Sequence, residues 1–132
     1  MVVAGHKSTY TLWRTGLPLG TGATDVATEG KTTVLKTELT ALKTAGSVAD
    51  YCTLGSVTSV DGTSNCTLTL NGDASYISSI AMLAPSPDWF IGLDSKNLCD
   101  GTSWITAGKE VVLYAYDGGK RTGTTWALSS TD

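Results

Sequence analysis

The feature that most limits what this chain can fold into is a series of short runs of β-forming residues that begins after Gly46. Turn-forming pairs such as Asp61-Gly62 and Asn71-Gly72 separate these runs, and so does the segment Pro85-Ser86-Pro87. Short strands with turns at this spacing are typical of an antiparallel β-sandwich, so the sequence predicts a mostly β protein. The predicted strands are Thr53–Val60, Cys66–Leu70, Ser75–Leu83, Trp89–Leu93 and Glu110–Tyr116.

One of these runs, Cys66–Leu70, also suggests a disulfide. Strict alternation places its cysteine and both leucines on one face and its threonines on the other. The Asp61-Gly62 turn between Cys52 and Cys66 allows the flanking segments to run antiparallel, which brings the two sulfur atoms within bonding reach. We therefore predict a Cys52–Cys66 disulfide. The alternative is that all three cysteines, Cys99 included, are small buried hydrophobic residues.

A single helix near residues 28–45 is predicted before the β-rich part of the chain. Its apolar residues recur at helical spacing and share one face. Thr28 or Gly30 is a suitable start, and Gly46 suits the left-handed position that ends a helix. The residues of this face are Val34, Leu35, Leu39 and Leu42.

Length and composition exclude several classes of protein. A chain of 132 residues suits one domain, residues 1–132. Nine basic residues are scattered singly and the net charge is −3, so nucleic acid is a poor candidate partner. No apolar run approaches the roughly 20 residues of a membrane span, and the first residues are too short for a signal peptide. His6 is the sole histidine and no nucleophile motif accompanies it, so we expect no enzyme.

Several exposed-type residues have two interpretations each. Trp13, Trp89, Trp104 and Trp126 could form a binding platform or fill a core, and alternation with Phe90 favours Trp89 as the core residue. Asn65-Cys66-Thr67 meets the pattern of a glycosylation acceptor. Asp94 lies in a predicted turn, where a carboxylate commonly accepts a hydrogen bond from its own backbone.

Two stretches of the chain resemble the spondin domain family, the amino-terminal module of F-spondin and mindin. One is Pro85-Ser-Pro-Asp-Trp-Phe-Ile-Gly-Leu-Asp continuing to Trp104, followed by Val-Leu-Tyr-Ala-Tyr-Asp117-Gly-Gly; the other is His6-Lys-Ser-Thr-Tyr-Thr-Leu-Trp13. The resemblance covers about His6 to Trp126. It implies an extracellular, C2-like β-sandwich that acts in adhesion or matrix binding rather than in catalysis, with an export leader absent from this chain.

The resemblance also implies a calcium site, which this sequence changes. Family members similar to F-spondin bind calcium through three aspartates, and the first two map to Asp88 and Asp117, whereas the third falls on Arg121. Calcium takes six to eight oxygen ligands, so a guanidinium here removes one oxygen and adds repulsion. We expect the ordinary site to be lost, no cofactor to be needed, and Arg121 to bridge the two carboxylates. The alternative is that calcium binds through the two aspartates, carbonyls and water.

A second departure concerns the beginning of the domain. The family domain begins with at least one strand before the His6 segment, and only five residues precede His6 here. We expect the sheet edge left by this missing strand to pair with another chain. If that chain is a further copy, the protein is a homo-oligomer or a structural subunit of an extracellular filament. The other expected role is binding of an extracellular protein or glycan through loops near Asp88, Trp89, Asp94 and Arg121. Cys99 is then a buried thiol or a bond to a neighbouring subunit.

Overall fold

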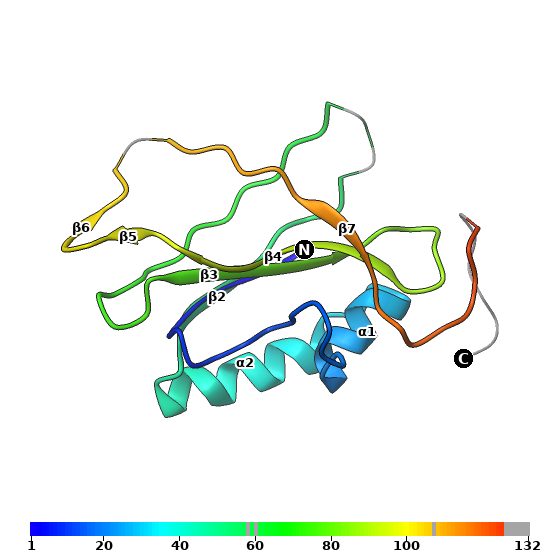
Figure 1. The fold of residues 1–132 in the computed structure, drawn as a ribbon, viewed down its shortest axis with the longest axis horizontal. Helices are drawn as coiled ribbons and strands as arrows, with labels where there is room; N and C mark the ends of the chain where they lie inside the picture. The colour runs from blue at the N-terminus through cyan, green and yellow to red at the C-terminus, as the bar shows by residue number, and fades with distance from the viewer. Residues whose placement is uncertain (58, 60, 107, 126–132) are drawn as a thin grey trace.

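One antiparallel sheet of five strands forms the centre of the computed structural model, which describes residues 1–57, 59, 61–106 and 108–125 (Figure 1). The strand order is β2-β1-β3-β4-β7, and the two remaining strands, β5 and β6, form a separate ribbon. The strands are β1 (Val2–His6), β2 (Val48–Thr53), β3 (Tyr76–Met82), β4 (Trp89–Asn97), β5 (Cys99–Asp100), β6 (Ser103–Trp104) and β7 (Tyr114–Asp117).

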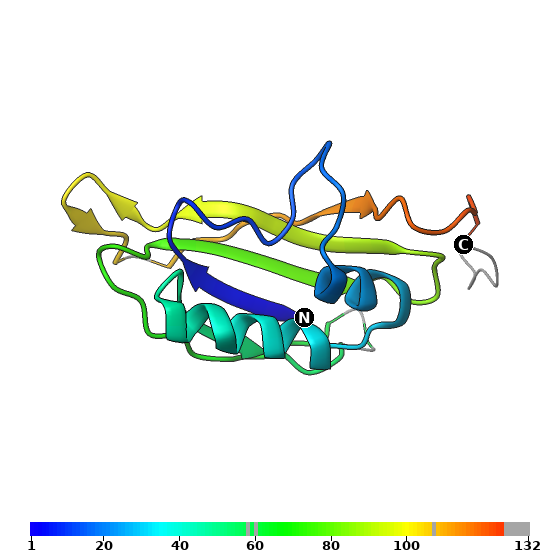
Figure 2. The same cartoon turned by 90° about the horizontal axis from the view of Figure 1, so that it is seen from below.

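The architecture is mixed α/β, which corrects the expectation of a mostly β protein. Helices α1 (Thr21–Glu29) and α2 (Thr33–Ala45) both lie on one face of the sheet (Figure 2). Irregular segments lie on the other side, and the described residues show no second sheet of a C2-like sandwich there. The expected strand Cys66–Leu70 is one of these segments: it forms no strand, and its Thr69 N–H donates to the carboxylate of Asp50 (3.0 Å) instead of to a neighbouring strand.

Two helices replace the one that was expected near residues 28–45. Gly30 takes a left-handed conformation (φ 68°) and ends α1, and a second glycine, Gly46 (φ 88°), ends α2 where the sequence predicted. The helices pack closely, and Gly22 permits this because it has no side chain: a Cβ there would lie 2.6 Å from Cα of Leu35. Glu38 of α2 accepts a hydrogen bond from the Gly22 N–H (2.9 Å), so the second helix caps the first. Among the described residues, neither α1 nor α2 is long and apolar enough to span a membrane.

The hydrophobic core lies between the helices and the sheet. Phe90 is 3% exposed in this core, whereas Trp89 is half-buried, so the expectation that Trp89 is the core residue of this pair is wrong. The reason is Trp13, whose ring meets Phe90 edge to face with centroids 5.1 Å apart and donates a hydrogen bond to the carbonyl of Ser79 (2.8 Å). The core also contains Val2, Ala4, Leu12, Val26, Leu35, Leu39, Val48 and Ile80.

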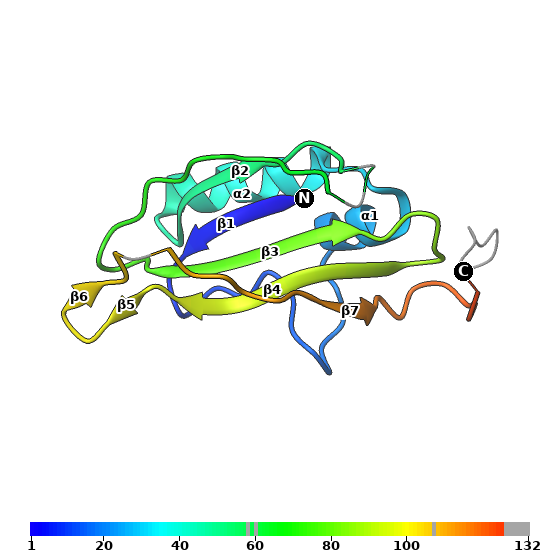
Figure 3. The same cartoon turned by 90° about the horizontal axis from the view of Figure 1, so that it is seen from above.

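Residues Val2 to His6 form an inner strand of the sheet, β1. β1 lies between β2 and β3, and its Val2 is opposite Thr53 on one side and Ile80 on the other. The edges of the sheet are therefore β2 and β7. The segment after β2 runs beside that edge (Figure 3), where the Cys52–Cys66 disulfide fastens it. The pairing of these cysteines is the one that the sequence predicted.

Candidate functional site

A buried carboxylate, that of Asp88, joins the start of β4 to the loop that follows β7. Asp88 is 0% exposed, and its Oδ2 accepts hydrogen bonds from the backbone N–H groups of Lys120 (2.6 Å) and Arg121 (2.8 Å). The backbone carbonyl of Asp88 accepts a third bond, from the N–H of Gly118 (3.0 Å). Converging N–H groups of this kind form a cradle for an anion. The carboxylate of Asp88 is thus met by the backbone N–H groups of Lys120 and Arg121.

Two glycines allow the loop to close around Asp88. A Cβ on Gly118 would lie 2.8 Å from the carbonyl oxygen of Asp88 and 3.3 Å from its Oδ2, too close to fit without a shift. Gly119 has a φ of 68°, a left-handed conformation that favours glycine. The sequence Asp117-Gly118-Gly119 is therefore the visible signature of the cradle, although the N–H donors themselves carry no signature.

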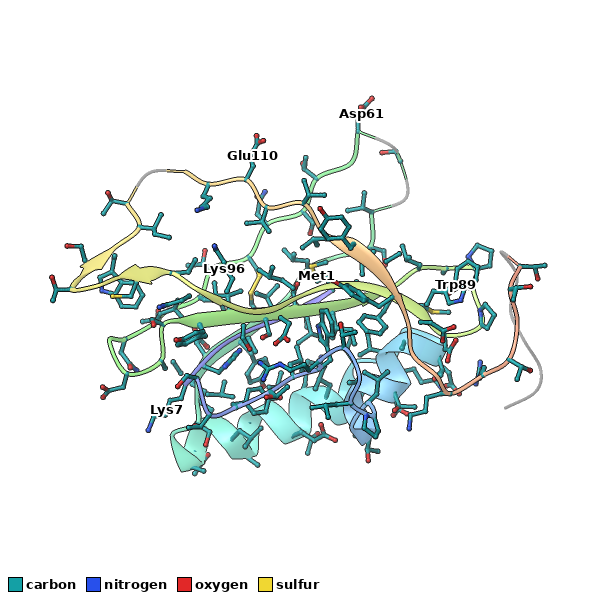
Figure 4. All side chains as sticks on the ribbon, in the orientation of Figure 1. Met1, Lys7, Asp61, Trp89, Lys96 and Glu110 are labelled. Carbon is teal, nitrogen blue, oxygen red and sulfur yellow. A yellow bond between two sulfur atoms is a disulfide. The ribbon has the colours of Figure 1, made fainter. Side chains whose placement is uncertain are left out.

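Asp117 lies on the surface at the end of β7, directly opposite Trp89 of β4. Its Oδ1 accepts a hydrogen bond from the N–H of Gly119 (2.8 Å), which shapes the turn that carries the cradle. Figure 4 shows Trp89 at this end of the sheet. The structure therefore brings together four of the expected site residues: Asp88, Trp89, Asp117 and Arg121.

The side chain of Arg121 reaches helix α1. Its Nη1 donates to the carbonyl oxygen of Thr28 (3.2 Å), and its Nη2 lies 3.7 Å from Oε1 of Glu29. Carbonyl oxygens at the C-terminal end of a helix carry a partial negative charge, which favours a cation there. These described contacts differ from the expected bridge between Asp88 and Asp117, since the backbone of Arg121 meets Asp88 and its guanidinium meets the helix.

The residues present do not fit the calcium site that the resemblance implies. The part of the chain that the structure describes contains no group of three His, Cys, Asp or Glu side chains placed to hold a metal ion. At the cradle, Oδ2 of Asp88 already accepts two N–H donors and Oδ1 of Asp117 accepts one. Oδ1 of Asp88 is buried without a hydrogen-bond partner among the described residues. One free buried oxygen and one surface carboxylate fall short of the six to eight ligands of calcium.

Asp94, also expected at the binding loops, lies elsewhere on β4. It forms a two-point ion pair with Arg14, with Nε to Oδ2 at 2.8 Å and Nη2 to Oδ1 at 3.2 Å. Partial burial opposes the charge of this carboxylate, but hydrogen bonds from Arg14 and Ser95 outweigh it and lower the pKa of Asp94. Lys96, two residues beyond Asp94, is well separated from Trp89 along β4 in Figure 4. Asp94 thus anchors the Arg14 loop and does not join the cradle.

His6 belongs to a buried network, in agreement with its expected packing role. Its Nε2 lies 2.7 Å from Oγ of Ser78, and its Nδ1 lies 2.7 Å from the carbonyl oxygen of Lys7. Ser78 in turn accepts a hydrogen bond from the N–H of Ser95 (2.9 Å), a residue with positive φ. Burial is the main cause that lowers the pKa of His6. The network fixes an irregular point of β4, and the serines in it had no sequence signal.

The remaining candidates lie apart from the cradle. Asn65 is exposed beside the disulfide-bonded Cys66. Cys99 is a free, half-buried thiol whose Sγ lies 3.4 Å from the carbonyl oxygen of Gly101. Trp126 and Val60 lie outside the described residues.

Comparison with known proteins gives the family. The Spondin_N family model matches residues 1–132. Spondin-2 of Homo sapiens is 34% identical over 125 residues, and Spondin-2 of Rattus norvegicus is 34% identical over 128 residues. Each alignment covers 94% of this chain but 38% of the relative, so the chain matches well under half of their length. With the family model matched from end to end and the cradle residues in the stretch that carried the resemblance, the chain belongs to the Spondin_N family.

Proposed function

We propose that this chain is a non-enzymatic, extracellular spondin module that binds another extracellular macromolecule, a protein or a glycan, in adhesion or in the matrix. Membership of the Spondin_N family and the similarity to Spondin-2 support this role. The Cys52–Cys66 disulfide supports an extracellular location, because disulfides persist in oxidising compartments. Asn65 is exposed and so accessible to glycosylation there.

The observation that carries the proposal is the cradle around Asp88. Three backbone hydrogen bonds to Asp88 and the Arg121 contact with Thr28 hold the loop after β7 in one conformation. This loop presents Asp117 on the surface beside the half-buried Trp89. Loops that a rigid scaffold positions are common binding sites, and preorganisation lowers the entropic cost of binding. The geometry supports a binding surface that works without calcium.

A cell-adhesion assay on surfaces coated with the chain tests this proposal. Asp117→Ala should reduce adhesion severalfold, because it removes the surface carboxylate and loosens the turn. Asp61→Ala is the matched control, since Asp61 is an exposed carboxylate on the loop after β2, away from the cradle (Figure 4). Equal adhesion of both variants and the wild type, with folding confirmed by circular dichroism, would count against this surface.

Self-assembly as a structural subunit is the second candidate function. The observation that favours it is the edge strand β7, which pairs with β4 alone among the described residues. Native mass spectrometry at micromolar concentration tests this candidate, because a structural subunit should form dimers or larger species. A monomer over the whole concentration range would exclude it and leave the adhesion proposal untouched.

A further inference from the structure

The two edges of the sheet are protected to different degrees. At β2, the Cys52–Cys66 disulfide and the hydrogen bond from Thr69 N–H to Asp50 hold a covering segment in place. At β7, the described part of the chain contributes no such cover, and the outer side of the strand has no ladder partner. Unpaired backbone groups along an exposed edge are a template for another strand.

The direction of one hydrogen bond shows which groups of β7 point outward. The N–H of Gly118 donates to the carbonyl of Asp88 on the β4 side. Tyr116 and Tyr114 lie two and four residues before Gly118, so their N–H and C=O groups also point toward β4. These directions alternate along an antiparallel strand. Ala115 and Asp117 therefore direct their N–H and C=O groups to the open edge.

The segment just before β7 is apolar and exposed. Val111, Val112 and Tyr114 are 43%, 74% and 66% exposed. Residues 108–113 form no helix, turn or strand, and they diverge from the sheet before β7 begins (Figure 1). The side chain of Glu110 points away from the sheet in this segment (Figure 4). Val111 and Val112 have no strand partner among the described residues, and exposed β-branched residues that continue the edge strand suit pairing with a second chain.

We propose that residues 109–117 pair antiparallel with the same residues of a second copy of this chain, with Leu113 on the twofold axis. This inference rests on the self-assembly candidate above and names its surface. In this register Lys109 lies opposite Asp117 of the second copy, so that the symmetry gives two ion pairs. Val112 lies opposite Tyr114 of the second copy, which covers the two most exposed large hydrophobic side chains among the described residues.

Charge selects this register over its neighbours. Only registers that place outward-facing groups opposite one another are possible, so the axis moves by whole residues from Leu113 to Tyr114 or Ala115. With Tyr114 on the axis, Lys109 faces Gly119 and both ion pairs are lost. With Ala115 on the axis, Lys109 faces Arg121, which has the same charge, and Glu110 faces Lys120, which has the opposite charge, so the repulsive and attractive pairs offset and no net ion pairing is gained.

Cysteine cross-linking distinguishes the registers. In a Cys99→Ser background, which removes the free thiol, Leu113→Cys places two thiols across the axis at a Cα separation of about 5.5 Å, suitable for a disulfide. Ala115→Cys is the matched control, because its two copies are offset by about 14 Å along the strands, beyond the roughly 7 Å limit. We expect Leu113→Cys to give a disulfide-linked dimer under mild oxidation and Ala115→Cys to form no covalent cross-link. Equal cross-linking of both, or of neither, would overturn the proposed register.

A proline variant tests the surface without added thiols. Ala115→Pro removes an N–H that points to the open edge, so the pairing with β4 is retained while pairing with a second copy is blocked. We expect the dissociation constant of the dimer to rise at least about tenfold in this variant relative to the wild type, a loss typical of one blocked ladder position in each copy. An oligomer that Ala115→Pro leaves unchanged would refute the β7 surface while self-assembly itself stands. A wild type that is monomeric throughout would refute both.

Discussion

Replacing Arg121 with aspartate should make the loop around Asp88 respond to calcium, at a cost in stability without the metal. The guanidinium is 19% exposed and donates to the carbonyl of Thr28, a hydrogen bond to a charged group that contributes about 1.5 kcal/mol. Its pair with the more exposed Glu29, at 3.7 Å, adds little because solvent screens the two charges. The free energy of unfolding of Arg121→Asp without metal should therefore fall by roughly 1.5 kcal/mol.

Calcium should return most of that loss in Arg121→Asp and little in the wild type. A third carboxylate beside Asp88 and Asp117 completes the three aspartates that the resemblance implies for a calcium site, and extracellular calcium modules bind with Kd values of about 1 mM. At about 10 mM calcium, such a site would stabilise the folded state by about 1.4 kcal/mol. Urea unfolding followed by tryptophan fluorescence, in calcium and in EDTA, measures both quantities.

Two outcomes of this experiment would refute the reasoning. Arg121→Ala is the control, since it removes the same contacts with α1 without adding a carboxylate, and it should lose roughly 1.5 kcal/mol that calcium does not return. A wild type that calcium stabilises as strongly as Arg121→Asp would show that the arginine does not prevent metal binding. An Arg121→Ala variant as stable as the wild type would show that the contact with α1 contributes little.

Three further changes test the fold. Removing the disulfide with Cys52→Ala and Cys66→Ala should lower the free energy of unfolding by about 3 kcal/mol, the value expected for a loop of this size, and a urea midpoint shifted by much less would contradict it. Gly92→Ala should cost at least about 2 kcal/mol because its Cβ would overlap a backbone oxygen of β3, whereas Gly72→Ala, with open space around it, should be nearly neutral in the same titration. The lowered pKa of His6 means that the unfolded chain binds the proton more readily, so stability should fall as the pH drops below about 6.5; a His6→Gln variant should show a weaker pH dependence of unfolding between about pH 6.5 and 5.

Local chemistry was enough to predict part of the fold. The left-handed Gly46 ended α2 where expected, and the prolines before β4 bounded that strand at Trp89. The Cys52–Cys66 pairing could also be found from a turn and a spacing. These features depend on residues close to each other in the chain, so the sequence pattern carries them.

Features that depend on distant partners were harder to predict. The leucines of the predicted helical face all follow Gly30, so they gave no sign of α1 or of the turn at Gly30 that brings α1 against α2. Cys66–Leu70 alternates as a strand does, yet no strand lies in register to accept its backbone. The contact of Arg121 with the carbonyl of Thr28 could not be read from the sequence, because a backbone acceptor leaves no residue signature.

The same limit applied to the candidate site. Asp88, Asp117 and Arg121 were found through their resemblance to a family motif, and the structure places all three at one loop. Asp94 came from the same motif but pairs with Arg14 farther along β4, since six steps along an extended strand carry it away from Asp88 by roughly 20 Å. Proximity in sequence along a strand is therefore a poor guide to proximity in a site.

The central position of β1 has a consequence for how the molecule is made. Val2 must find Thr53 on one side and Ile80 on the other, so both partners emerge from the ribosome long after β1 itself. Pairings this distant in sequence slow folding, because a long loop must close before any contact is gained. Until β3 has been synthesised, the side of Val2, Val3 and Ala4 that will pair with it remains open to chaperones or to other nascent chains.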